Sequence, residues 1–482
     1  MPRVVRAFKT CLRHIDASDF YTWAAAVSLN EALVGRRRDR HTTWMIVVKV
    51  SVPRRTAVGL CSALVAVSGA CFPASRPSEE PAGRAATAQG QIRALFERRA
   101  DALAAGSVEE YLGSLSPPAR SFEAPIARGA AKLPLAGVRM VVREADVAPD
   151  GQSVDGARID FTYWFEGLAE DNLFHIFLIN DLERRGSRWQ VTSSAIDEAR
   201  YDMHAGSPLP LWATGPFRTT RSEHFLALYR PGPGEIGSVV QLAERAYANL
   251  FPKLTFDPEP GYLLVAARNE DEYAELVGPR TAESSIAIAT AESVRAAGRG
   301  MSGLGGERPE TRHMVVDLTA ATGGGSVSDH AHVEGAGVAQ VIQHELGHLA
   351  LLRVTSTFTP GWVKEGAAMY LAGERRIDEW SAGLATGAFE DLSFRTLSRA
   401  ENVRGEFGYS YVNAATSYLI ERFGAKTFFE FYRGFKDFEV IEVKPDKATR
   451  SERTQRLLNL VYGITERDLD RATRAYIKDA AG

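Results

Sequence analysis

A short histidine motif constrains this chain more than any other feature. His344 and His348 flank Glu345 in the pattern His-Glu-x-x-His, within a segment whose apolar residues recur every three or four positions. That periodicity predicts an amphipathic helix, on which the two histidines lie one turn apart on the same face. Two neutral imidazoles at this spacing can bind one zinc ion. Glu345 can then accept a proton from a water that the metal activates. The apolar positions are Val338, Val341, Ile342, Leu346, Leu349 and Leu352.

The alternative is that the motif arose by chance in a chain with ten histidines. Burying three unpaired polar groups in so apolar a helix would be costly. We therefore expect His344 and His348 to be metal ligands and Glu345 to be the general base.

The third ligand is expected downstream of the motif. Residues 349–354 contain neither Gly nor His, which excludes the metzincin pattern. Pro360 precedes a further predicted helix, and Glu365 lies in its first turns. A carboxylate from that helix completes a His, His, Glu site with one position left for water, whereas a solvated helix glutamate is the alternative. The expected cofactor is one Zn²⁺ per chain.

The motif and the segment after it resemble the gluzincin metallopeptidases. The similarity is to the peptidase-MA-like group, which has the thermolysin-type and aminopeptidase-type catalytic core. It covers roughly residues 220–480. The segments that carry it are 344–348, 362–368, 407–411 and 414–424. The resemblance implies a zinc metallopeptidase that acts on a peptide or protein substrate.

The resemblance also implies roles for residues outside the metal ligands. Tyr409 or Tyr411 would donate a hydrogen bond to the oxyanion, and the alternative for each is a tyrosine that packs a helix start. An edge strand near 314–318, just before the zinc helix, would pair with the extended substrate. Thermolysin-type enzymes carry an acidic residue four positions after the glutamate ligand, where this chain has Met369. The partner of the zinc histidine must therefore come from elsewhere.

The expected fold class is α+β, with two folded domains. Residues 90–205 read as helices followed by a strand meander, which resembles an NTF2-like or cystatin-like cone. Residues 206–482 are expected to form the gluzincin domain, with a small mixed sheet, the zinc helix and a helical C-terminal part. The expected strands of the first domain are 138–147, 157–165, 173–180 and 189–193.

Two further sites have weaker support from the pattern. Aromatic residues of the first domain either form its core or line a ligand pocket with His175, and a pocket lined by Trp164, Phe174 and His175 would indicate a binding module. His330 and His332 form a candidate second metal pair, although loop histidines are common.

The N-terminal region predicts export. Residues 45–71 resemble a signal peptide, with Arg54 and Arg55 before an apolar stretch. Cys71 ends a segment that resembles a bacterial lipobox, which would anchor the protein to the membrane through a lipid; ordinary cleavage after Ala70 is the alternative. We expect translation to start at Met45, with residues 1–44 an upstream extension that the natural protein lacks. Residues 72–89 are expected to be a flexible linker.

Composition narrows the function further. A net charge of −3 without a dominant basic block argues against a nucleic-acid partner. No cysteine follows Cys71, so the exported chain would contain no intramolecular disulfide. We expect an extracytoplasmic zinc metallopeptidase, either a membrane lipoprotein or a secreted protein. The alternative is a zinc-binding scaffold lipoprotein without catalytic activity.

Overall fold

The computed structural model describes two compact units, residues 1–77 and residues 78–482. The described residues are 32–34, 45–47, 80–200, 209–232, 236–277, 287–293, 310–318, 321, 337–356, 358–398, 403, 407–436 and 447–481. In the first unit, β1 (Ala32–Val34) pairs antiparallel with β2 (Met45–Val47). Cys71 and most of the expected leader lie outside the described residues.

The second unit begins with a four-stranded antiparallel sheet and three helices. The strands follow one another in the order β3, β4, β5 and β6. Their bounds are Leu135–Glu144, Ser153–Phe165, Phe174–Arg185 and Arg188–Ile196. Two of the connecting turns contain Gly151 and Gly186, whose φ angles of 71° and 64° favour glycine. Each of the four expected strands therefore corresponds to a strand of this sheet.

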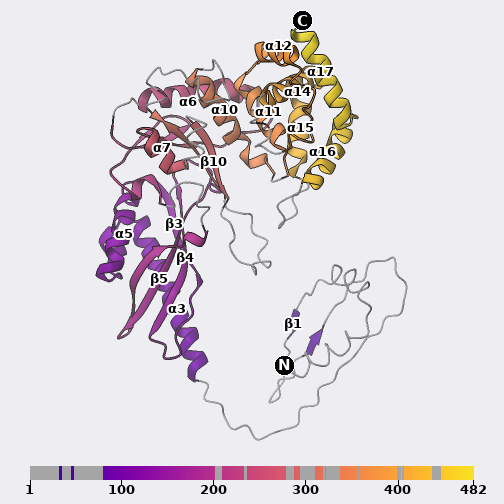
Figure 1. Ribbon diagram of the computed structural model, residues 1–482. Helices are drawn as coiled ribbons and strands as arrows, with labels where there is room; N and C mark the ends of the chain where they lie inside the picture. Colours follow the sequence, from indigo (N-terminus) through magenta and orange to yellow (C-terminus); the bar gives the residue numbers. More distant parts are fainter. Residues whose placement is uncertain are drawn as a thin grey trace. The chain divides into compact units, whose positions relative to one another are not determined.

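Helices α3 (Glu80–Ala104), α4 (Val108–Leu112) and α5 (Pro117–Ala130) accompany this sheet (Figure 1). Helix α3 contacts β3 and α5 contacts β6, and Ile92 and Phe96 of α3 are fully buried. The helix begins at Glu80, so the second half of the expected flexible linker is helical instead. Alanine is the strongest helix former, and the segment from Glu80 to Gln89 contains four alanines.

A second, five-stranded sheet has the order β10-β11-β9-β8-β7. The inner strands β8 (Phe225–Tyr229), β9 (Tyr262–Ala267) and β11 (Glu310–Asp317) are parallel. The edge strands β7 (Arg218–Arg221) and β10 (Ala287–Ser293) run antiparallel to their neighbours. Among the described residues, the last strand before the histidine helix is β11, which is an inner strand and not the edge strand expected near 314–318. The edge near that helix is formed by β10.

The two faces of the five-stranded sheet bury different cores. Along β9, Leu264 and Ala266 belong to the core that also contains the histidine helix. Leu263 and Val265 belong to the core of the four-stranded sheet. Side chains alternate across a strand, so the five-stranded sheet lies between the two cores. One of its faces packs against the core of the histidine helix, and the other packs against the core of the four-stranded sheet. The expected domain boundary at 205/206 falls in residues 201–208, outside the described residues.

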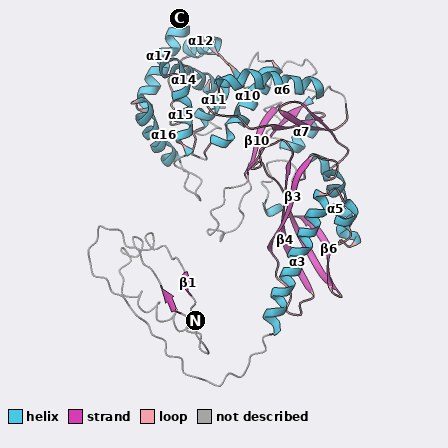
Figure 2. Ribbon diagram, turned by 180° about the vertical axis from the view of Figure 1, so that it is seen from behind, coloured by secondary structure: helices cyan, strands magenta, loops and turns pink. Residues whose placement is uncertain are grey.

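The rest of the unit is helical. Helices α6 and α10 lie along the five-stranded sheet, and the later helices gather beyond α10 (Figures 1 and 2). The bounds are α6 (Ile236–Leu250), α7 (Glu270–Val277), α10 (Val338–Leu351), α11 (Gly361–Ala372), α12 (Ile377–Thr386), α14 (Gly408–Phe423), α15 (Ala425–Gly434), α16 (Lys447–Tyr462) and α17 (Glu466–Ala481). Short 3₁₀ helices occupy Glu198–Arg200, Leu211–Ala213, Phe251–Lys253 and Leu352–Val354.

The described part of the chain is thus a mixed α+β structure with two sheets and many helices. Among the described residues, no helix combines the length and the apolar character needed to span a bilayer.

Candidate metal centre

Helix α10 carries the His-Glu-x-x-His motif and is held against the sheet by its apolar face. Ile342, Leu346 and Leu349 are fully buried. Gly347, between the motif residues, faces α11 closely, because a Cβ there would lie 3.3 Å from the Cα of Ala368. The absence of a side chain at Gly347 therefore lets α11 approach the two histidines.

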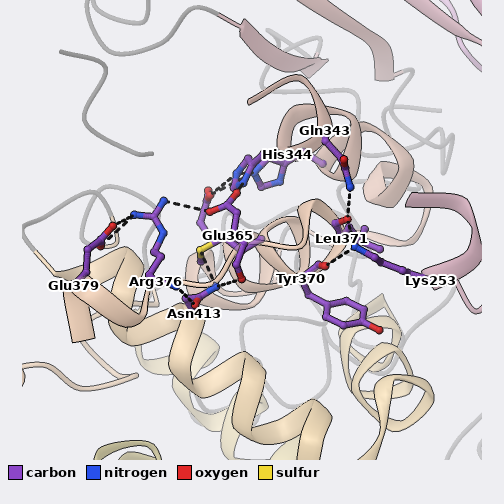
Figure 3. Close-up of polar contacts among 12 residues, drawn as sticks. Lys253, Gln343, His344, Glu365, Tyr370, Leu371, Arg376, Glu379 and Asn413 are labelled. Carbon is purple, nitrogen blue, oxygen red and sulfur yellow. Dashed lines mark hydrogen bonds and ion pairs between the residues drawn. The ribbon is translucent and has the colours of Figure 1, made fainter. Parts of the chain in front are cut away.

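Helix α11 brings Glu365 to the motif. Its N-terminal N–H groups are bound from outside the helix: Gly361 donates to the carbonyl of Ser398 at 2.9 Å, and Trp362 donates to that of Leu397 at 3.2 Å. At its other end, Gln343 of α10 and Lys253 donate to the carbonyl of Leu371 at 2.9 and 2.8 Å (Figure 3). Because both ends of α11 are bound, the position of Glu365 is fixed relative to α10.

Two imidazole nitrogens and one carboxylate oxygen form a compact triangle of possible metal ligands. The Nε2 atoms of His344 and His348 are 3.1 Å apart, and the Glu365 carboxylate lies 3.4 and 3.3 Å from them. A tetrahedral zinc ion with donors at about 2.0–2.2 Å requires donor–donor distances of about 3.3–3.6 Å. The observed triangle is close to that size. Within the described residues, one group of His, Cys, Asp or Glu side chains is close enough together to hold a metal ion, and it consists of these three residues.

Charge compensation inside this cluster is strong. Burial disfavours a charged His344, but Glu374, Glu365 and Glu345 outweigh it and raise the pKa of the imidazole well above its ordinary value. Burial likewise disfavours a charged Glu365, yet His348 and His344 lower the pKa of its carboxyl well below the usual range. The carboxylate form that metal ligation needs is therefore favoured at Glu365.

Glu345 lies beside these groups and is half-buried. Its charge contributes to the raised pKa of His344. The motif glutamate therefore lies at the edge of the cluster, in a position to exchange a proton with a bound molecule.

The sequence did not reveal one residue at the cluster, Glu374. Its Oε1 lies 2.6 Å from Nδ1 of His344, on the side of the ring opposite the donor triangle. Glu374 follows Gly373, the C-cap of α11, whose φ of 71° ends the helix. A glycine C-cap is readable from sequence, but the direction in which the next side chain points is not. Met369, at the position where thermolysin-type enzymes have an acid, is fully buried.

The two candidate tyrosines lie in different surroundings. Tyr411 is fully buried, and its hydroxyl donates to Asp470 of α17 at 3.0 Å. This hydroxyl is used in the helical core, and an oxyanion role for Tyr411 stays an untested prediction. The ring of Tyr409 lies 5.5 Å from the guanidinium of Arg376, which itself contacts Glu374. The oxyanion role of Tyr409 stays a prediction.

The first-domain pocket is only in part as expected. A cavity of about 70 Å³ is lined by Phe174 and His175 together with residues of the second sheet. Trp164 is not in its lining; it packs over Gly137, where a Cβ would lie 2.1 Å from the indole. His175 is held by Asp160 at 2.9 Å. Ligand binding there stays a prediction, and His330 and His332 lie outside the described residues.

Comparison with known proteins gives little further information. No protein-family model and no curated protein matches this chain. Among solved structures, the chain is similar to a mutant M1 zinc metallopeptidase from Deinococcus radiodurans, at 15% identity and a TM-score of 0.29. The similarity covers 61% of this chain and spans 58% of that protein. A likeness at this level does not indicate the function of this chain.

Proposed function

We propose that this protein is a zinc-dependent metallopeptidase that hydrolyses peptide bonds. One observation carries the proposal: His344, His348 and Glu365 converge in a triangle of 3.1, 3.4 and 3.3 Å with the motif glutamate beside it. Two imidazoles and one carboxylate form a donor set typical of catalytic zinc, because three protein ligands leave a coordination position open.

The proposed chemistry divides between the metal and Glu345. When bound, zinc supplies Lewis acidity that polarises a carbonyl and lowers the pKa of a water. Glu345 accepts a proton from the attacking water while the water oxygen bonds to the carbonyl carbon. The same carboxyl then delivers that proton to the amide nitrogen as the C–N bond breaks. The remaining proton of the water passes from the new carboxylic acid to the amine, so the products are a carboxylate and an ammonium group, and atoms and charge balance.

The proposed substrate is an extended peptide or protein segment. Strand β10 forms the edge of the five-stranded sheet, and the histidine helix α10 packs against it. Backbone N–H and C=O groups along an edge strand can pair with an added strand. A substrate bound along β10 would therefore run close to the cluster. This assigns to β10 the role that the sequence suggested for 314–318.

The finer architecture and the location belong to the same proposal. The antiparallel sheet β3–β6 with its helices supports an NTF2-like or cystatin-like first domain. The mixed sheet followed by α10 and α11 supports a gluzincin-type peptidase domain. The leader in the sequence supports export, with lipid anchoring at Cys71 or secretion.

The test is a cleavage assay with the full chain loaded with zinc. Wild type, Glu345→Gln and the control Glu421→Gln are incubated with a diverse peptide mixture, and new termini are identified by mass spectrometry. Glu421 forms an exposed ion pair with Arg375. Wild type and Glu421→Gln should cleave equally, and Glu345→Gln about 10²–10⁴-fold more slowly. One bound zinc per chain without cleavage would refute the peptidase and favour a zinc-binding scaffold.

A further inference from the structure

We propose that Glu374 is the positioning residue for His344, and that Asn413 of α14 fixes Glu374 in turn. The inference rests on the proposed zinc site but not on peptidase activity. It assigns the orienting carboxylate, which the sequence could not locate, to a turn beyond the end of α11. The contact that carries it is the 2.6 Å distance between Nδ1 of His344 and Oε1 of Glu374.

This contact determines which nitrogen of His344 faces the cluster. A carboxylate can only accept a hydrogen bond, so Nδ1 must carry a proton, and in the neutral imidazole that metal ligation requires, Nε2 then keeps its lone pair. Nε2 is the atom that lies 3.1 Å from His348 and 3.4 Å from Glu365. Glu374 thus fixes both the tautomer and the ring orientation, and its negative charge makes Nε2 a stronger donor.

Glu374 is itself held in place by an ion pair with Arg376. Its second oxygen lies 3.2 Å from Nη2 of Arg376. The other terminal nitrogen of that guanidinium donates to Glu379 at 3.0 and 3.2 Å. Glu374 and Arg376 are both buried. A buried carboxylate with a single partner could rotate away, whereas this series of ion pairs keeps its orientation fixed.

Asn413 fixes the backbone of the same turn (Figure 3). Its Nδ2 donates to the carbonyl of Glu374 at 3.1 Å, and its Oδ1 accepts from the N–H of Arg376 at 3.2 Å. The amide therefore bridges both ends of the short segment that carries the carboxylate. Asn413 is buried and lies on α14, which also packs against α11. One helix thus positions both the helix of Glu365 and the partner of His344.

The experiment measures zinc affinity by chelator competition in the full chain, as wild type, Glu374→Gln, Glu374→Ala and Asn413→Ala. Glu374→Gln keeps the shape and a hydrogen-bond acceptor but loses the charge. Residues that orient metal ligands typically contribute about 10–100-fold in affinity. We expect about a 10-fold loss for Glu374→Gln, up to about 100-fold for Glu374→Ala, and a loss between wild type and Glu374→Ala for Asn413→Ala.

The matched control comes from the same turn. Arg375 points outward, is half exposed and pairs with Glu421 at 2.5 Å. Arg375→Ala should leave zinc affinity unchanged while removing an ion pair from the adjacent position. The thermal midpoint of each metal-free variant reports folding separately. The visible spectrum of the cobalt-loaded protein reports ligand geometry, and it should change in Glu374→Ala but not in Arg375→Ala.

Wild-type affinity and cobalt spectrum in both Glu374 variants, with the fold intact, would overturn the proposal. An equal affinity loss in Arg375→Ala would also overturn it, because the effect would then be general to the turn. If Asn413→Ala fails to fold, the isosteric Glu374→Gln still decides. Loss of zinc affinity in a protein that cleaves no peptide supports this inference and refutes the peptidase, so the two claims fail separately.

Discussion

Gly366 lies against Thr416 so closely that a Cβ on the glycine would be 2.1 Å from the threonine Oγ1. Gly366 follows Glu365 on α11, and Thr416 is on α14, so this contact sets the distance between the two helices. The packing of α14 thereby determines where the Glu365 carboxylate lies.

A methyl group at position 366 should displace α11, and with it Glu365, through a clash with α14. Gly366→Ala must push α11 away from α14, which costs about 1–3 kcal/mol of stability and moves Glu365 from the histidines. Thr416→Ala removes the clashing hydroxyl, so the double variant should recover part of both losses. Urea unfolding and zinc titration of the four proteins measure the coupling. Strictly additive effects would contradict this packing relationship.

Asn172 should be a main stabilising contact between the two sheets. Its Oδ1 accepts from the N–H of Arg312 at 2.8 Å, and its Nδ2 donates to the carbonyl of the same residue at 2.9 Å. Asn172→Ala leaves two buried backbone groups unpaired, which should lower the free energy of unfolding by about 2–4 kcal/mol. The exposed neighbour Glu170→Gln should change it little. Equal unfolding curves for the two variants would refute this role.

Acid should weaken the four-stranded sheet through Asp160. Burial raises the pKa of this carboxyl, but His175 and Arg143 outweigh burial and lower it to about 2. The unfolded value is about 3.9, so the contribution is complete above about pH 4 and is lost as the pH falls through about 2. It amounts to about 2 kcal/mol.

Asp160→Asn should therefore lower the free energy of unfolding at pH 7 and flatten its decline between pH 5 and pH 2. The measurement is urea unfolding across that pH range. Asp155→Asn, an exposed change on the same strand β4, should behave like wild type. A wild-type pH profile in Asp160→Asn would show that this carboxylate does not stabilise the sheet.

The candidate metal-binding cluster could be predicted from sequence as far as its determinants are local. The spacing of His344 and His348 fixes their shared helix face, and Pro360 marks the helix that delivers Glu365. Glu374 could not be predicted because its direction depends on the left-handed turn at Gly373 and on Asn413, 39 residues away. Tyr409 and Tyr411 were equivalent by pattern, and only the partner of Tyr411 on α17 separates them.

The fold shows the same limit. Alternation and turn residues predicted the four strands from β3 to β6, because neighbouring antiparallel strands are joined by short turns. The order of the five-stranded sheet depends on crossovers through α6 and α7, so the edge position of β10 was not readable. The first turns of α3, before residue 90, were not predicted, because their mixture of Pro, Ala and Gly resembles a linker.

The most direct test of the zinc site is an anomalous diffraction map at the zinc edge, from crystals of the zinc-loaded protein. The proposal predicts one peak per chain, about 2.0–2.2 Å from Nε2 of His344, Nε2 of His348 and a carboxylate oxygen of Glu365. A zinc peak bound by other residues, or no peak at these three atoms under saturating zinc, would contradict it.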